Sequence, residues 1–211
     1  MSQNPYLIIG EFEKRIAEWC GAKYGVAVES GTAAIFLSLQ YVKHRGEIGT
    51  SCVVEIPKFT YNSVPASIIH TGYHTWFNDD KWVGEYELYP LGIWDAALRL
   101  KNGMYHGGLQ CLSFHVKKLL PIGRGGMILT DDKYAYEWLK LARFDGREPV
   151  PLLEQKDFTV LGWNMYMQPA DAARGIQLFE VYRQKYPEGA GDLKVEEQGY
   201  CDLSKFEIYR Q

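Results

Sequence analysis

Two adjacent lysines, Lys117 and Lys118, close the segment 113–118 (SFHVKK), which follows an apolar run and precedes the glycine-rich segment 123–126 (GRGG). A lysine amine held beside glycine-rich backbone at a strand end can form a Schiff base with an aldehyde cofactor. The alternative is a solvated surface charge, the usual state of a lysine in such a place. The segment therefore indicates covalent chemistry only if other parts of the chain supply matching groups.

A glycine turn follows an earlier apolar run, in the segment 30–34 (SGTAA). Gly31 allows a ligand to approach the backbone closely, and a helix that begins there offers unpaired N–H groups and a positive dipole end. These properties favour a phosphate site at Gly31 and Thr32. An ordinary strand-to-helix turn with a serine or threonine cap is the alternative.

Two further strand ends have groups suited to an aromatic cofactor. Segment 57–61 (PKFTY) can lay the ring of Tyr61 over a flat ligand, or it can place an aromatic residue in the core. Asp95 directly follows the apolar segment 91–94 (LGIW). A carboxylate there is costly unless it is paired, and a pyridinium nitrogen would be a suitable partner; a helix cap is the alternative. Phosphate site, stacking ring, carboxylate and amine are together the parts that a pyridoxal phosphate site requires.

The periodicity of the apolar residues predicts the elements that position these groups. Helical spacing predicts a first helix over residues 8–19, ending at Gly21, and short β-branched runs alternate with further helical patterns. This alternation predicts an α/β domain with a mostly parallel sheet, at whose carboxyl edge ligands bind. The predicted strands are 24–28, 52–56, 73–77, 91–94, 109–114 and 127–130, and the later helices are 31–42, 61–70, 133–143 and 169–186.

Composition excludes several other classes of protein. The 211 residues are 46% hydrophobic, enough for a substantial core, and the length suits one domain, or one domain with a small appendage. The net charge of -3 and the lack of a basic, aromatic-interleaved run predict no nucleic-acid groove. The four cysteines form no CxxC pair, which predicts reduced thiols in a cytoplasm and no metal site. Neither an export signal nor a run as long as a membrane span is present, so we expect a cytoplasmic chain with no membrane contact.

Several motifs follow one another in a familiar order. They are residues 11–13 with 20–26, 30–34, 57–61, 95–97, 113–118, 125–126, 143–146 and 162–167. Their order over residues 8–186 resembles the DegT/StrS (DegT/DnrJ/StrS) family of fold-type-I pyridoxal-phosphate aminotransferases, best known for aminating keto sugars attached to nucleotides. The resemblance implies a fold-type-I large domain with pyridoxal 5'-phosphate as the cofactor.

The resemblance also implies roles for single residues. In the family's lysine motif the lysine comes five residues after the serine, which makes Lys118 the Schiff-base residue and Lys117 a bystander. Lys118 and Asp95 are then the catalytic pair, and Asn164 reaches a phosphate across a dimer interface, so a homodimer with shared active sites is expected. The implied cofactor-binding residues are Gly31, Thr32, Tyr61, Asp95, Ser113, Lys118 and Asn164.

The chain departs from the family pattern in length and at Leu98. Family members are usually close to twice as long: only residues 78–90 stand where the family has a long insertion, a tight connection for parallel strands. We therefore expect an aminotransferase-like domain over residues 1–186, and a tail over 187–211 that is at most a remnant of the small domain. Leu98 replaces a glutamine or histidine near the cofactor's phenolic oxygen, where Arg99 is a candidate substitute.

The expected reaction is the transfer of an amino group, from glutamate, to a keto sugar, nucleotide-linked, or to another small carbonyl compound. Lys118 would move a proton as base and acid, while Asp95 keeps the ring nitrogen protonated. His115 is interpreted as a structural neighbour, and Arg124 either anchors a substrate carboxylate or is a solvated charge. Two alternatives remain. One is a different reaction, such as sugar dehydration, against which Lys118 counts because dehydrating members have histidine there. The other is a reduced homologue that binds cofactor without turnover.

Overall fold

The computed structural model describes residues 4–49 and 51–210. Each helix and strand predicted from the sequence is confirmed, with ends shifted by a few residues. The helices are α1 (Leu7–Cys20), α2 (Gly31–Arg45), α3 (Ser63–Thr71), α4 (Lys133–Ala142) and α5 (Pro169–Lys185). The strands are β1 (Tyr24–Val28), β2 (Val53–Pro57), β3 (His74–Asn78), β4 (Tyr86–Leu88), β5 (Ile93–Asp95), β6 (Leu109–Ser113) and β7 (Gly126–Thr130). Short 3-10 turns are η1 (Leu152–Glu154), η2 (Val195–Gln198), η3 (Leu203–Lys205) and η4 (Glu207–Tyr209).

The main sheet has the strand order β1-β7-β6-β5-β4, and β2 and β3 form a separate parallel pair. Within the main sheet β5 and β6 are parallel, whereas β7 is antiparallel to both β1 and β6. β1, β5 and β6 therefore run in one direction and end at one edge, which we call the carboxyl edge. The α/β class is as predicted, but the sheet is mixed because β4 and β7 oppose the other strands.

Strand β4 was not predicted, and it explains how residues 78–90 form so short a connection. A crossover between parallel strands needs about a dozen residues or more. β4 instead pairs with β5 as an antiparallel hairpin, in which Tyr86 lies opposite Asp95. Just after β4, the backbone N–H of Glu55 donates to the Tyr89 carbonyl at 2.8 Å, which links the β2–β3 pair to the main sheet.

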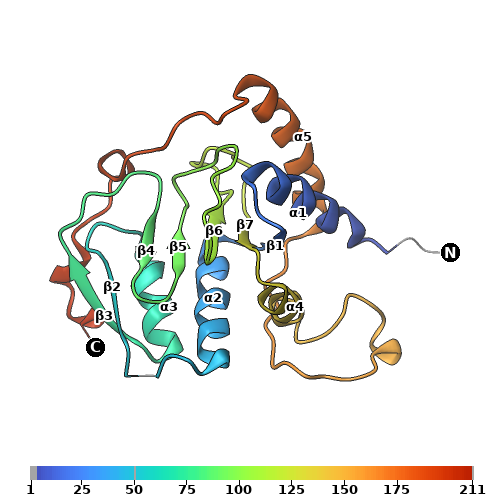
Figure 1. Ribbon diagram of the computed structural model, residues 1–211, viewed down its shortest axis with the longest axis horizontal. Helices are drawn as coiled ribbons and strands as arrows, with labels where there is room; N and C mark the ends of the chain where they lie inside the picture. Colours follow the sequence, from blue (N-terminus) through green and yellow to red (C-terminus); the bar gives the residue numbers. More distant parts are fainter. Residues whose placement is uncertain (1–3, 50, 211) are drawn as a thin grey trace.

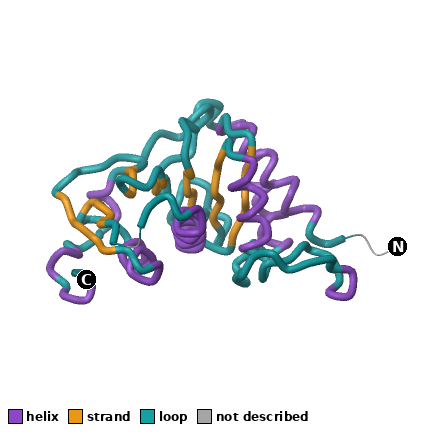
Figure 2. Tube along the Cα trace, turned by 60° about the horizontal axis from the view of Figure 1, so that its bottom comes forward, coloured by secondary structure: helices purple, strands orange, loops and turns teal. Residues whose placement is uncertain are grey.

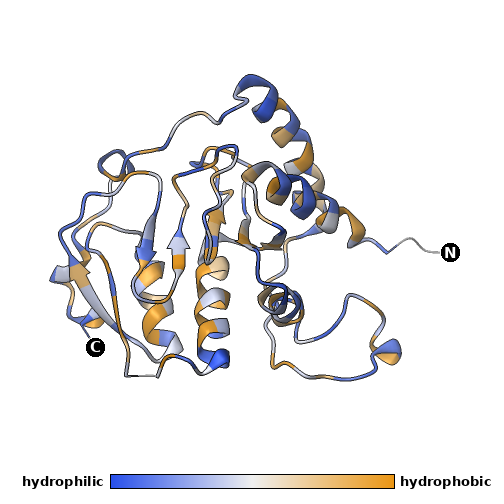
Figure 3. Ribbon diagram, in the orientation of Figure 1, coloured by the Kyte–Doolittle hydropathy of each residue, from blue (hydrophilic) through white to orange (hydrophobic). Residues whose placement is uncertain are grey.

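Helices cover both faces of the sheet, as Figures 1 and 2 show. The pleat alternates side chains between the two layers: Val26 and Val28 face the core beneath α2, α3 and α4, while Ala27 faces α1 and α5. α1 ends at Gly21, whose φ of +86° is the left-handed conformation that glycine adopts without strain. α2 lies centrally against the sheet, and its hydrophilic last turn projects beyond it (Figure 3).

The chain after α5 returns across the molecule to end beside β3 (Figure 1). Among its backbone contacts with the body, the Leu193 N–H donates to the Leu98 carbonyl at 2.9 Å, and the Leu203 N–H donates to the Lys58 carbonyl at 3.0 Å. We call residues 192–203 the strap, because they span the carboxyl edge between these attachments. None of the helices within residues 4–49 and 51–210 combines the length and the apolar character of a membrane-spanning segment.

Candidate functional site

The turn between β1 and α2 forms one wall of the candidate site. Ser30 is extended and caps α2, its Oγ accepting from the Ala33 N–H at 3.0 Å. The N–H groups of Gly31 and Thr32 have no partner within the helix, because the first turn of a helix lacks acceptors. Thr32 Oγ1 lies 2.8 Å from Ser63 Oγ, which joins the starts of α2 and α3. This turn thus offers backbone donors and a positive dipole end to an anion.

Two glycines let three segments meet at this turn. A Cβ atom on Gly31 would lie 2.9 Å from Cβ of Ser113, at the end of β6. One on Gly126 would lie 2.4 Å from the Ser30 carbonyl oxygen. Because real Cβ atoms essentially never approach that closely, a larger residue at either position would push the segments apart. The hydroxyl of Ser113 is therefore held beside the start of α2.

Lys118 and Asp95 lie together at the carboxyl edge. Asp95 ends β5, is only 3% exposed, and accepts a hydrogen bond at Oδ1 from the Ala97 N–H at 3.0 Å. Lys118 is half-buried, while Lys117 beside it is exposed. Phe114 fixes the start of this segment, because it is buried against Phe12 of α1 with ring centroids 5.3 Å apart.

Burial disfavours the charged form of both groups. It raises the pKa of the Asp95 carboxyl, an effect that the Ala97 N–H, the Lys118 charge and the Tyr86 hydroxyl offset only in part. Burial lowers the pKa of the Lys118 amine, Asp95 raises it and the Lys117 charge lowers it further. The site therefore holds a carboxyl whose charge lacks full compensation and an amine with an increased neutral fraction. Such values are typical of functional sites.

Two tyrosines near Asp95 and Lys118 were not identified from the sequence. Tyr86 of β4 is buried, its hydroxyl lies 2.6 Å from Thr60 Oγ1, and it faces Asp95 across the hairpin. Tyr200 of the strap accepts a hydrogen bond from Lys118 Nζ at 3.4 Å. No local pattern signals either one, because each reaches the site through a strand or tail that periodicity does not reveal.

Tyr61 lies at the same edge but is open to solvent. Its side chain is 55% exposed, and its ring centroid lies 6.2 Å from that of Tyr200. The structure thus brings Tyr61 to the vicinity of Lys118 and Asp95 by way of Tyr200. Six of the seven implied cofactor-binding residues therefore surround one region of the carboxyl edge, namely Gly31, Thr32, Tyr61, Asp95, Ser113 and Lys118.

Asn164 is not part of this group within one chain. Its side chain is exposed, and Nδ2 donates to Asp145 Oδ2 at 3.1 Å. Arg124 forms an ion pair with Glu29 at 2.9 Å.

Arg99 is not available as a substitute for the hydrogen-bonding residue that Leu98 replaces. Its guanidinium is paired with Glu85 and with Asp192, the latter at 2.7 Å, so that possibility is wrong. Leu98 itself is fully buried in the core.

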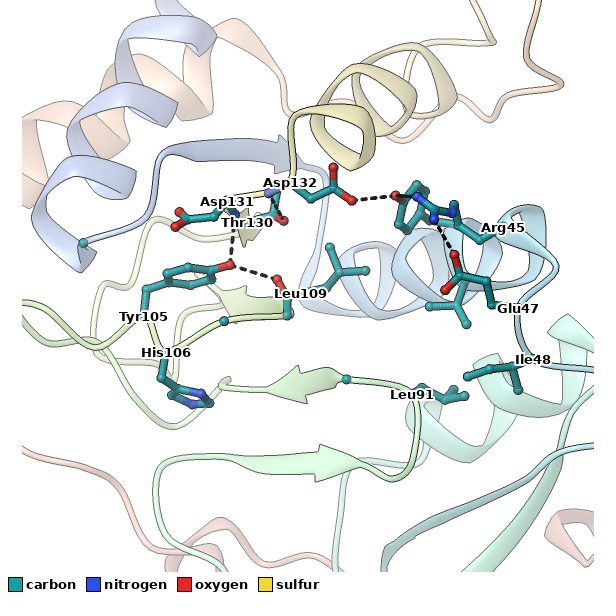
Figure 4. Close-up of a pocket in the computed structure, with 16 residues that line it drawn as sticks. Arg45, Glu47, Ile48, Leu91, Tyr105, His106, Leu109, Thr130, Asp131 and Asp132 are labelled. Atoms are coloured by element: carbon teal, nitrogen blue, oxygen red, sulfur yellow. Dashed lines mark hydrogen bonds and ion pairs between the residues drawn. The ribbon is translucent and has the colours of Figure 1, made fainter.

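A cavity of about 730 Å³ lies at the opposite edge of the sheet (Figure 4). Its polar groups are satisfied by one another. The Tyr41 hydroxyl donates to Asp132 at 2.9 Å, and Arg45 pairs with Glu47. The Tyr105 hydroxyl accepts from the Asp131 N–H at 2.9 Å. We call this the cavity edge; it offers space without convergent unpaired groups. In the described part of the chain, no cluster of side chains is suited to hold a metal ion.

Comparison with known families matches most of the chain, over residues 4–83 and 101–185, to the model of the DegT/DnrJ/EryC1/StrS aminotransferase family. The chain belongs to this family. The matched stretches contain Gly31, Thr32, Tyr61, Ser113, Lys118 and Asn164, whereas the unmatched residues 84–100 contain β4, β5 and Asp95. The assignment of Asp95 therefore depends on its geometry beside Lys118.

Relatives in the family are considerably longer than this chain. GDP-perosamine synthase of Caulobacter vibrioides is 27% identical over 215 positions, covering 82% of this chain and 56% of that protein. Spore coat polysaccharide biosynthesis protein SpsC of Bacillus subtilis is 25% identical over 230 positions, covering 89% of this chain and 54% of that protein. The chain thus spans about half the length of these relatives.

A solved structure supports the fold. The DegT DnrJ EryC1 StrS aminotransferase from Brucella abortus superposes with a TM-score of 0.68 at 21% identity, over 82% of this chain and 58% of that one. The α/β fold is therefore the fold of this family's aminotransferases.

Proposed function

We propose that this chain is the cofactor-binding part of a pyridoxal-phosphate-dependent aminotransferase. The observation that carries the proposal is the pairing of a buried carboxyl, Asp95, with a half-buried amine of lowered pKa, Lys118, beside the first turn of α2. A buried carboxyl without full compensation suits a cationic ring nitrogen, and an amine with a larger neutral fraction suits an aldehyde. Membership of the aminotransferase family supports the same cofactor.

The groups present fit pyridoxal phosphate. The N–H groups of Gly31 and Thr32, with the Ser113 hydroxyl held close by, would bind its phosphate. Tyr61 would lie over the ring, and Asp95 would accept a hydrogen bond from the protonated ring nitrogen. When bound, the cofactor supplies an aldehyde carbon that amines attach to and a ring that accepts electrons from an adjacent carbon.

The residues of the chain then have separable tasks. Lys118 Nζ would act as base and then acid: it would take up the proton that leaves the α-carbon of the amino donor and return it to a neighbouring carbon. Its lowered pKa helps, because only the neutral amine can accept a proton. The buried Asp95 would keep the ring nitrogen protonated, and its hairpin partner Tyr86 would hold that carboxyl in place.

For the substrates, we propose glutamate as donor and a keto sugar, linked to a nucleotide, as acceptor. Support comes from the name of one relative, GDP-perosamine synthase, which refers to a nucleotide-linked amino sugar.

The four free cysteines suit a reducing, cytoplasmic environment. The exposed Asn164 suits a role in the active site of a second copy. The exposed Leu153 and Leu161 belong to the segment between α4 and α5, which projects from the body in Figure 1. These features support a homodimer.

The test is the absorbance spectrum of the purified protein titrated with pyridoxal phosphate, followed by borohydride treatment and mass analysis of the labelled peptide. We expect a near-visible band that borohydride removes, with the label on Lys118. Lys118→Ala should abolish the label, whereas Lys117→Ala, a matched change on an exposed neighbour, should retain it.

Addition of glutamate then separates the possible functions. An aminotransferase converts the bound cofactor to its amine form, with loss of the near-visible band and release of the keto acid. A labelled protein that glutamate leaves unchanged would identify a cofactor-binding homologue without turnover. A protein that never takes up a label at Lys118 would refute the proposed function altogether.

A further inference from the structure

The strap is attached firmly at its two ends. At the first end, Asp192 pairs with Arg99 at 2.7 Å, and the buried Val195 anchors η2 in the core. At the second end, the Leu203 N–H donates to the Lys58 carbonyl at 3.0 Å. Residues 196–202 lie between these anchors and cross the carboxyl edge. Both ends of this stretch are therefore fixed.

The middle of the strap places Tyr200 inside the candidate site. The Tyr200 hydroxyl accepts from Lys118 Nζ at 3.4 Å, and its ring centroid lies 6.2 Å from that of Tyr61. Burial and the nearby Asp95 charge raise the pKa of the Tyr200 hydroxyl, which places this ring close to the carboxyl as well. One aromatic ring thus lies among the amine, the carboxyl and the exposed tyrosine.

We propose that Tyr200 is a built-in plug that occupies the place of the cofactor ring, so that the middle of the strap must lift before cofactor binds. This inference rests on the proposed function and adds to it a regulation of the same site. A cofactor ring bound to Lys118 and Asp95 beneath Tyr61 would need the space that the Tyr200 ring fills, and two rings cannot share it. The closed strap and the bound cofactor therefore exclude each other.

The Tyr200 ring packs against the core, but its polar attachment is weak. Among the described residues, the Tyr200 side chain makes a single hydrogen bond, the long one to Lys118. The stronger attachments of the strap, at Asp192 and Leu203, are outside the space of the ring and need not break. Opening is thus a local movement of residues 196–202. The apparent affinity for cofactor is then the intrinsic affinity multiplied by the fraction of molecules in the open state.

The test compares Tyr200→Ala, Tyr200→Phe and the wild type in titrations with pyridoxal phosphate. Phe206→Ala, which removes an exposed aromatic ring from the same tail, is the matched control. We expect Tyr200→Ala to lower the apparent Kd by about three- to tenfold, because it removes both ring and hydrogen bond. Tyr200→Phe should give a smaller gain, and Phe206→Ala none. Hydrogen exchange of residues 196–202 in the wild type should become faster when cofactor binds.

The possible outcomes distinguish failure of the Tyr200 plug from failure of the proposed function. Wild-type binding without a gain in Tyr200→Ala, or with protection of residues 196–202 by the cofactor, overturns the plug and leaves the proposed function intact. Absence of cofactor binding in every variant overturns the proposed function and the plug with it. Tighter binding in Tyr200→Ala together with faster exchange in the wild type supports both.

Discussion

The two edges of the main sheet differ in a way that locates function. The cavity edge has about 730 Å³ of space, lined by polar groups that already have partners. At the carboxyl edge the Tyr200 hydroxyl accepts from Lys118, and the edge holds Asp95 and Lys118 with their charges incompletely compensated. Uncompensated charge, rather than empty volume, therefore marks the candidate site.

Two aspartates make the contrast concrete. Burial raises the pKa of Asp95 despite its hydrogen bond from Ala97. At the cavity edge, burial of Asp132 is outweighed by hydrogen bonds, first from Tyr41, and the pKa of that carboxyl is lowered. The same side chain is thus stabilised as an anion at one edge and destabilised at the other. A cationic group of a ligand would therefore be stabilised more beside Asp95 than beside Asp132.

The largest expected effect is on cofactor affinity, which should fall on substitution at the carboxyl edge but not at the cavity edge. Asp95→Asn removes the partner of a protonated ring nitrogen and should weaken pyridoxal phosphate binding by roughly ten- to a hundredfold, as expected for a hydrogen bond to a charged group. Asp132→Asn, the same change at the cavity edge, should leave binding unaltered. The measurement is the absorbance titration of both variants.

Equal weakening of cofactor binding by the two substitutions would contradict this difference between the edges. That result would mean that a general loss of stability, and not a contact at the carboxyl edge, controls affinity. Circular dichroism of both variants at the titration temperature checks that each remains folded.

Glycine substitutions at the two ends of α2 should give the next largest effect. A Cβ on Gly31 meets Ser113 at 2.9 Å, so Gly31→Ala should lower the free energy of unfolding by about 1–3 kcal/mol through overpacking. Adding Ser113→Gly should restore part of this loss, because it removes the clashing atom. Chemical denaturation of the single and double variants measures the coupling.

The control is Gly46→Ala at the other end of the same helix. Gly46 has open space around it but a φ of +68°, so alanine there costs about 1 kcal/mol through backbone strain alone. That loss should not respond to Ser113→Gly. Rescue of Gly46→Ala by Ser113→Gly would show that the close approach at the carboxyl edge is not specific.

Much of this contrast was accessible from the sequence. Strong apolar periodicity identified α1, β1 and α2. β1, β5 and β6 run in one direction, as in the predicted sheet, although the described residues 96–108 between β5 and β6 form no helix. Because parallel strands end at one edge, Gly31, Asp95 and Lys118 could be placed together before their positions were known. Local pattern suffices where a residue's place is set by the strand that it follows.

The remaining features depend on contacts distant in the chain. β4 has three residues, too few for any periodicity, and forms because a short connection can only fold back as a hairpin. The partnership of Arg99 with Asp192, and that of Lys118 with Tyr200, joins residues more than eighty positions apart. No local signal encodes such pairs. The division of the chain at residue 186 and the role of Asn164 stay predictions.

The smallest expected effect concerns the stability of the cofactor-free protein. Substitution of Asp95 and of Asp132 by asparagine should change the free energy of unfolding at pH 7 in opposite directions. The folded-state pKa of Asp95 is raised, so its favourable contribution is complete below the unfolded pKa and is lost as the pH rises through the folded pKa. Asp95→Asn retains an acceptor for Ala97 and should therefore raise the free energy of unfolding at pH 7. The folded-state pKa of Asp132 is lowered, so its contribution is present above the unfolded pKa and is lost as the pH falls.

Asp132→Asn should accordingly lower the free energy of unfolding at pH 7, and only slightly, because this side chain is exposed. Both differences should fade as the pH falls to about 3, where carboxyl groups in the wild type become protonated. Urea denaturation of the wild type and both variants at the two pH values measures the four differences. Destabilisation by Asp95→Asn at pH 7 would contradict the claim that the carboxyl edge stores an uncompensated charge, and the distinction between the edges would then reduce to shape.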